Sequence, residues 1–195
     1  MRYAKDHKEK TRQRIIETAA QNFREKGFEG EGIASVMQGA GLTNGAFFNH
    51  FSSKEDLARE VIAFAMAERL DFVNAKLDNG EGVQGYIASY LSIRHRDHPE
   101  HGCPMATLAT DIARRAPPVR EAFSAGLNTL VDRLATEWPQ LGDVEARARG
   151  FALFSLLNGC LQLARATDDE ALSAEILASG RRAAKQLVEA PADSA

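Results

Sequence analysis

The sequence predicts an all-α protein with an N-terminal head of three helices and a larger C-terminal helical bundle, about nine helices in all. Residues with high helix propensity dominate the composition, and β-branched residues are scarce. Apolar residues recur at spacings of three and four along most of the chain, as in amphipathic helices. The 195 residues, 44% hydrophobic and 26% charged, suffice for one large or two small domains with a buried core.

The first expected helix covers residues 8–26, where the apolar residues between Ile15 and Phe23 form one stripe. Gly27 is expected to end this helix, because glycine readily adopts the left-handed conformation that closes helices. A second, shorter helix is expected at 33–39, followed by a turn that contains Gly41. These two helices would pack against each other through their apolar faces.

Thr43 is expected to cap a third helix, whose inner face carries Phe47 and Phe51. A fourth helix follows and continues toward residue 77. Its start matches a capping box in either of two ways: Ser52 with Glu55, or Ser53 with Asp56.

The rest of the chain is divided by glycine, proline and polar residues into further helices. Residues 78–82 form one break, and residues 95–103 form a polar loop. The expected helices cover 83–96, 104–115, 118–137, 143–166 and 170–189. Residues 190–195 are expected to be a frayed tail.

Residues 33–51 have the layout of a helix-turn-helix, whose second helix can enter the major groove of DNA. Five residues occupy the outward face of that second helix: Thr43, Asn44, Gly45, Phe48 and Asn49. Glycine within a helix costs about 1 kcal/mol relative to alanine. The cost is explained if the backbone at Gly45 must come close to DNA.

Charge is distributed unevenly along the chain. Residues 1–14 hold six Lys/Arg against two Asp/Glu, a net charge of +4, whereas residues 61–195 have a net charge of −4. A basic arm on an acidic body favours local contact with phosphates. Lys54 stands in the first turn of a helix, where the macrodipole disfavours a cation unless an anion binds there. His50 lies close by in the sequence, so we expect both residues to hold phosphates.

Residues 11–57 resemble the N-terminal domain of the TetR family of bacterial transcriptional regulators. The resemblance is carried by Gly27-Phe28, Ala40-Gly41-Leu42-Thr43, Gly45, His50-Phe51 and Ser53-Lys54-Glu55. It implies that residues 43–49 face bases and phosphates of double-stranded DNA, in a pseudo-palindromic operator. It also implies a homodimer that binds a small-molecule effector in its body, and a repressor released by that effector or by thiol modification.

On this basis we expect three parts. Residues 1–54 would be the DNA-binding domain, residues 55–189 the effector-binding and dimerisation domain, and residues 190–195 the tail. The last two helices usually form the dimer in this family. The expected helix at 143–166 carries a broad apolar face, which favours a symmetric interface. Aromatic residues of the body are candidates for an effector pocket: Phe64, Phe72, Tyr86, Tyr90, Phe123 and Trp138.

The head departs from the family pattern at several positions. Asn44 stands where a lysine is usual, and Phe48 where a tyrosine hydroxyl usually reaches a phosphate. Glu31-Gly32 replaces a hydroxyl-bearing residue, and Met37 replaces a small alanine. The first three changes remove phosphate contacts or add an acidic group, which predicts weaker DNA affinity. Asn44 has the geometry to pair with an adenine edge instead.

Cys103 is the most specific functional candidate in the body: it could sense an effector or an oxidant. Gly102-Cys103-Pro104 places its thiol at the N-cap of a helix, where the thiolate is favoured. The alternative is a small buried thiol with a packing role. The spacing of His95, His98 and His101 before Cys103 fits no compact metal site, so we expect neither a metal nor a cofactor.

Two other functions stay open: a helical binding protein that has lost DNA affinity, and a thiol-dependent all-α enzyme. The second lacks an oriented catalytic group beside Cys103, so we do not expect an enzyme. Two cysteines are too few for a disulfide scaffold, and no apolar run reaches the ~18 residues of a membrane span. The first residues are charged and do not resemble a secretory leader. We therefore expect a cytoplasmic protein.

Overall fold

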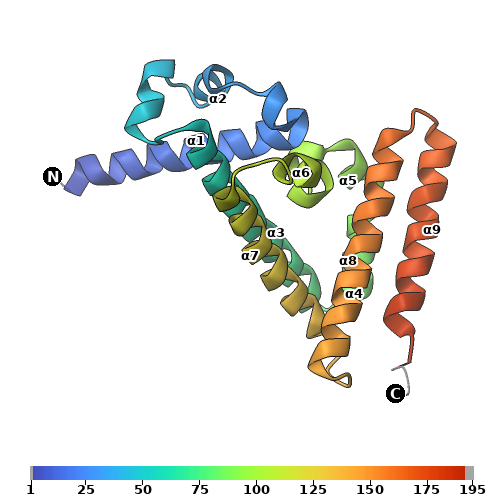
Figure 1. Ribbon diagram of the computed structural model, residues 1–195. Helices are drawn as coiled ribbons and strands as arrows, with labels where there is room; N and C mark the ends of the chain where they lie inside the picture. Colours follow the sequence, from blue (N-terminus) through green and yellow to red (C-terminus); the bar gives the residue numbers. More distant parts are fainter. Residues whose placement is uncertain (1, 192–195) are drawn as a thin grey trace.

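The computed structural model describes residues 2–191, with side chains from Asp6 onward, and this part is all-α with no strand, as predicted. Figure 1 shows the head, which consists of α1, α2 and η1, lying across one end of the body, which consists of α3 to α9. Within the body, α3 lies beside α7 and α8 beside α9. The elements are α1 (Arg2–Gly30), α2 (Ile33–Gly39), η1 (Asn44–Asn49), α3 (Lys54–Asp78), α4 (Gly82–Tyr90), α5 (Ile93–Asp97), η2 (Pro99–His101), α6 (Pro104–Ile112), α7 (Pro117–Ala135), α8 (Asp143–Ala166) and α9 (Glu170–Glu189).

The head forms around the apolar stripe of α1, as the sequence predicts. Ile15, Phe23, Phe28 and Phe47 are fully buried there. Helix α1 begins earlier than expected, and Gly27 interrupts it with φ +74°, where the expected stop lies. After this break Phe28 turns back onto Phe23, with ring centroids 4.7 Å apart.

The turn between α2 and η1 is closed by Gly41, which has φ +70°. The N–H of Leu42 donates to the carbonyl of Met37 at 2.8 Å, and the N–H of Gly41 donates to that of Gln38 at 2.9 Å. This pair of bonds is the Schellman motif, which requires a left-handed residue at the position of Gly41. The predicted turn is thus fixed by one glycine.

The third helix differs from the prediction, because η1 is a six-residue 3-10 helix and not an α-helix. Thr43 occupies its N-cap position, but the threonine side chain makes no capping hydrogen bond. Helix α3 begins as expected: the Ser53 hydroxyl accepts the N–H of Asp56 at 3.1 Å. The Asp56 carboxylate accepts the N–H of Ser52 at 3.0 Å, so the cap uses both serines.

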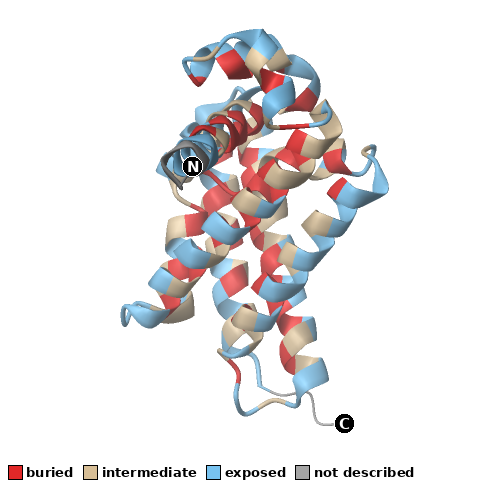
Figure 2. Cartoon of the chain, turned by 90° about the vertical axis from the view of Figure 1, so that its left-hand side faces the viewer, coloured by how far each residue is buried: buried red, intermediate tan, exposed pale blue. Residues whose placement is uncertain are grey.

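The body follows the predicted helices with one break that the apolar spacing did not indicate. The expected helix 83–96 is divided into α4 and α5, because the Ser92 hydroxyl accepts the N–H of His95 at 3.1 Å and caps a new helix. The expected loop at 95–103 contains η2. Buried residues gather along the inner faces of the long helices, and exposed residues cover their outer turns (Figure 2).

Two sequence-based expectations fall partly outside the described residues. These are the side chains of Arg2 and Lys5 in the basic arm, and residues 192–195 of the tail. Within residues 2–191, no helix is both long and apolar enough to cross a membrane.

Candidate nucleic-acid interface and ligand cavity

The turn and η1 present a row of residues to the outside of the head. The structure places Thr43, Asn44, Gly45, Phe48 and Asn49 on this exposed surface. Phe48 is 73% exposed, and its ring meets the buried Phe47 edge-on with centroids 5.2 Å apart. The segment therefore divides as the sequence predicts, with Phe47 and Phe51 in the core and the other side chains available to a partner.

Gly45 has no structural role inside this chain. A Cβ atom added at Gly45 would meet no atom within 4 Å, and the residue does not have a positive φ. Neither packing nor backbone geometry requires glycine at this position. A partner that approaches the backbone closely would require it.

The two expected phosphate-binding residues have different surroundings. His50 is half-buried, and its Nδ1 is buried without a hydrogen-bond partner. Burial and the nearby charges of Lys8 and Arg12 lower the pKa of His50. Lys54 donates from Nζ to the carbonyl oxygen of Phe28 at 2.6 Å. Since an ammonium has three donors, Lys54 can keep this bond and still contact a phosphate.

Glu31 is placed differently from what the departure from the family pattern suggested. Its side chain is only 2% exposed, so it does not add an acidic group to the outer surface. The carboxylate accepts hydrogen bonds from Asn22 at 2.7 Å and from Lys26 at 3.4 Å. Burial alone would raise the pKa of Glu31, but hydrogen bonds from Ser35, Asn22 and Lys26 outweigh burial and lower it. Glu31 therefore joins the end of α1 to the start of α2.

A cavity of about 790 Å³ lies between the head and the body. Its walls come from α1, α3, α4, α5 and η2, and they include Arg24, Arg69, Phe72, His95 and Gly102. This volume is typical of sites for drug-sized molecules. Among the expected pocket aromatics, Phe72 lines this cavity. Tyr86 and Tyr90 are buried against Arg69.

Arg69 is the most unusual residue of this wall. Its guanidinium carbon lies 4.6 Å from the ring centroid of Phe72, 5.4 Å from that of Tyr86 and 4.7 Å from that of Tyr90. Arg69 is 6% exposed, and its Nε is buried without a partner. No carboxylate of residues 6–191 forms an ion pair with it, and one long hydrogen bond reaches the Tyr86 hydroxyl at 3.4 Å.

Cys103 is fully buried at the N-terminus of α6, behind the cavity wall that Gly102 and His95 form. The Cys103 N–H donates to Nε2 of His95 at 3.0 Å, and Nδ1 of His95 lies 2.7 Å from the Tyr90 carbonyl. His95 is therefore the neutral tautomer with its proton on Nδ1. Burial, Arg69 and Arg165 lower the pKa of His95 to about 3.

The histidines before Cys103 do not come together. His98 and His101 are exposed and lie near Glu100, whereas His95 points inward. Over the described side chains, no group of three or more His, Cys, Asp or Glu is arranged to hold a metal ion.

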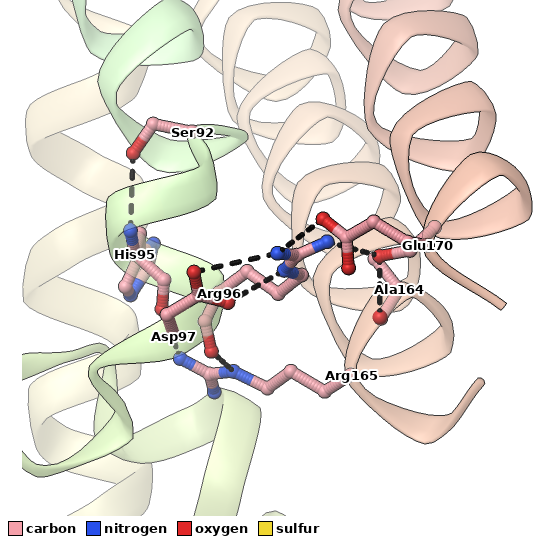
Figure 3. Close-up of polar contacts among 8 residues, drawn as sticks. Ser92, His95, Arg96, Asp97, Ala164, Arg165 and Glu170 are labelled. Carbon is pink, nitrogen blue, oxygen red and sulfur yellow. Dashed lines mark hydrogen bonds and ion pairs between the residues drawn. The ribbon is translucent and has the colours of Figure 1, made fainter. Parts of the chain in front are cut away.

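A polar network fixes the short helix α5, and with it His95, against α8 and α9 (Figure 3). Arg96 donates to Glu170 at 2.8 Å and to Ser173 at 2.9 Å. Arg165 donates to the carbonyl of Arg96 at 3.0 Å and also to that of His95. These contacts hold one cavity wall on the last two helices.

A second set of contacts joins the head to α6. Arg115 follows α6 and donates to Glu29 at 2.6 Å and to Glu55 at 2.9 Å. Its guanidinium carbon also lies 4.7 Å from the ring centroid of Phe28. On α6 itself, Asp111 accepts the N–H of Phe28 at 3.3 Å. The end of α1 and the start of α3 are thus attached to α6 and to the segment that follows it.

Comparison with known proteins identifies the family. The family model described as bacterial regulatory proteins, tetR family, matches residues 15–61. The tetracyclin repressor-like C-terminal domain matches residues 80–179, about half of the chain. This chain belongs to the TetR family of transcriptional regulators. The N-terminal TetR model covers the turn and η1, and the C-terminal model covers α4 to α8 and the first half of α9.

Individual TetR relatives agree with this assignment. The HTH-type transcriptional regulator LmrA of Bacillus subtilis is 24% identical over 144 residues, which cover 71% of this chain and 77% of LmrA. The HTH-type transcriptional repressor KstR2 of Mycobacterium tuberculosis is 30% identical over 86 residues. That match covers 42% of this chain and less than half of KstR2, 43%.

Solved structures of TetR proteins share the fold. The reduced form of Escherichia coli NemR has a TM-score of 0.77 at 21% identity, covering 94% of this chain and 99% of that one. A TetR-family regulator from Agrobacterium tumefaciens has a TM-score of 0.73 at 22% identity, covering 90% and 98%. At these identities the likeness concerns the fold alone.

Sequence reasoning missed the charged residues of the cavity. Arg24 and Arg69 lie on amphipathic helices, where an arginine is normally solvent-exposed. The available signal was the position of Arg69 on the apolar face of α3, four residues after Ala65 and four before Val73. That spacing places a charge on the buried face, where it needs a partner.

Proposed function

We propose that this TetR-family regulator is a cytoplasmic homodimeric repressor that binds a pseudo-palindromic operator through residues 43–49 and releases it when an effector binds the body. Residues 1–54 act as the DNA-binding domain and residues 55–189 as the effector-binding and dimerisation domain. The observation that carries the proposal is the exposed segment with Gly45, whose lack of a side chain has no internal reason. His50 and Lys54 follow this segment in the chain and would hold phosphates.

The sharpest test is Gly45→Ala. A methyl group at this position contacts nothing in the free protein, so folding should be unchanged or slightly better, by up to about 1 kcal/mol. Operator affinity should fall at least about tenfold, since the methyl group would stand between the backbone and DNA. The operator is first selected from a random duplex pool, and affinity is then measured by fluorescence anisotropy at two salt concentrations.

Gly142→Ala is the matched control, because a Cβ at Gly142 also meets no atom within 4 Å and α8 begins far from the head. It should leave operator affinity unchanged. If Gly45→Ala binds as tightly as the wild type, the proposed DNA-facing segment is wrong. If the wild type binds no duplex at low salt, the protein is instead a helical binding protein without DNA affinity.

The proposed dimer uses the outer faces of α8 and α9. Phe151, Leu163 and Leu172 are 37%, 61% and 45% exposed, which is unusual for large apolar residues of long helices. Gly159 lies on the same helix as Leu163 and has open space around its Cβ position, so a second backbone can approach. Leu163→Glu should convert the dimer to a monomer in sedimentation velocity, whereas Val144→Glu, at an 86% exposed site near the start of α8, should not.

Release by thiol modification is a second candidate, favoured by the position of Cys103 at the N-terminus of α6 and close to Arg69. The related NemR structure is described as a reduced form. N-ethylmaleimide should weaken operator binding of the wild type but not of Cys103→Ser. Cys160→Ser is the control for modification of the second cysteine, which lies half-buried on α8, and it should lose operator binding like the wild type. Equal loss in Cys103→Ser and the wild type would exclude this candidate.

A further inference from the structure

Arg69 carries a charge that no carboxylate in the described part of the chain balances. A buried charge is usually paired with an opposite charge, because desolvation is costly. Arginine cannot escape this cost by losing its proton. The aromatic rings around Arg69 offset part of it, but they accept no hydrogen bond from the buried Nε.

The other charged groups of the cavity have partners or reach water. Glu68 accepts from Arg24 at 3.1 Å, and Glu100 lies 3.1 Å from His98. Asp71 and Arg94 are exposed. Among the described residues that line this cavity, Arg69 is thus the charged group that is buried and has no carboxylate partner.

Arg24 adds a second unsatisfied donor to the same cavity. It is 6% exposed, and its Nε is also buried without a partner, although its terminal nitrogen contacts Glu68 and the carbonyl of Gly102. Arg24 comes from α1 in the head and Arg69 from α3. Two guanidinium groups from different elements therefore have an unused Nε at one cavity.

We propose that this cavity binds an organic carboxylate whose charge is neutralised by Arg69 and whose apolar part lies against Phe72. The inference rests on the proposed effector function and names the chemical class of the effector. A carboxylate is favoured among anions because its two oxygens match the planar fork of a guanidinium. The volume of about 790 Å³ leaves room for an aromatic or acyl group attached to it.

The probes are three matched pairs that differ in charge and hardly in shape: benzoate and benzamide, 2-naphthoate and 2-naphthamide, decanoate and decanamide. Binding is measured by isothermal titration calorimetry on the full chain without DNA. In at least one pair the carboxylate should bind at least about tenfold more tightly than the amide, as expected for a buried charge pair. No preference for the carboxylate in any pair would overturn the proposal.

Arg69→Met removes the charge and keeps the volume, so the preference for the carboxylate should disappear. The thermal midpoint without ligand should stay the same or rise, because replacing an unpaired buried charge removes a desolvation cost. Arg94→Met removes an exposed arginine of the same wall and should keep the preference. Arg69→Lys is the second variant. It keeps the positive charge but lacks the planar guanidinium that can donate two parallel hydrogen bonds, so it should weaken carboxylate binding.

Two results would contradict the role of Arg69. One is a carboxylate preference that survives in Arg69→Met. The other is a lower thermal midpoint in Arg69→Met together with unchanged carboxylate binding in Arg69→Lys, which would make Arg69 a structural residue. Operator binding is measured separately: a carboxylate that binds without weakening it would exclude the effector role but support the anion site.

Discussion

Residues 43–49 of the head and the cavity of the body place their polar side chains in opposite ways. In the head, the core is built from apolar side chains such as Phe23 and Phe47, and the polar side chains of residues 43–49 point outward. In the body, charged and titratable groups such as Arg69 and His95 are turned inward around a cavity. The difference suggests that the head is shaped for a large external partner and the body for a small enclosed one.

The largest expected effect concerns the core of the head. Phe47→Ala should destabilise the protein by about 3–5 kcal/mol, because it leaves a cavity where a fully buried ring packs against Phe51. Phe48→Ala is the matched control, since Phe48 is 73% exposed, and its stability should change by no more than about 0.5 kcal/mol. Urea denaturation followed by circular dichroism measures both. Equal effects would show that the two faces of η1 are not distinct.

The next effect concerns the inward polar groups of the body. The pKa of His95 is about 3 in the folded protein and near 6.5 in the unfolded chain. The unfolded state therefore binds more protons between these values, and stability should fall as the pH drops below about 6.5. At pH 5 the loss from this residue is about 2 kcal/mol.

The control for this pH dependence is a pair of histidine variants. His95→Gln should lose less stability than the wild type between pH 7 and pH 5, because glutamine does not titrate there. His98→Gln should behave like the wild type, since His98 is exposed. Chemical denaturation at several pH values measures the difference. An unchanged slope in His95→Gln would mean that other groups cause the acid sensitivity.

The smallest effect concerns Ser53, where the head passes into the body. Ser53→Ala removes the hydroxyl that accepts the Asp56 N–H at the start of α3, and should cost about 1 kcal/mol. Ser124→Ala, at an exposed site within α7, should have almost no effect. Thermal unfolding of both variants gives the comparison. A stability loss in Ser124→Ala as large as that in Ser53→Ala would remove the capping explanation.

Features set by neighbouring residues could be predicted from the sequence, whereas features set by contacts between helices could not. Local signals determine the helix-turn-helix: Gly41 closes the turn, and Phe47 and Phe51 lie four residues apart on one face. The sequence could not show that Lys54 binds the carbonyl of Phe28, because that contact depends on how α1 and α3 meet. It could not reveal the break at Ser92 either, since apolar spacing continues across it. The apolar spacing places Arg69 on the buried face of α3, but its aromatic surroundings depend on how α3 packs against α4 and could not be predicted.

Arg115 makes several contacts between the helices of the head and the segment that follows α6. One guanidinium group binds Glu29 through one nitrogen and Glu55 through another, and it also lies over the ring of Phe28. Displacement of the segment between α6 and α7, which carries Arg115, would therefore remove two ion pairs and one cation–π contact with α1 and α3.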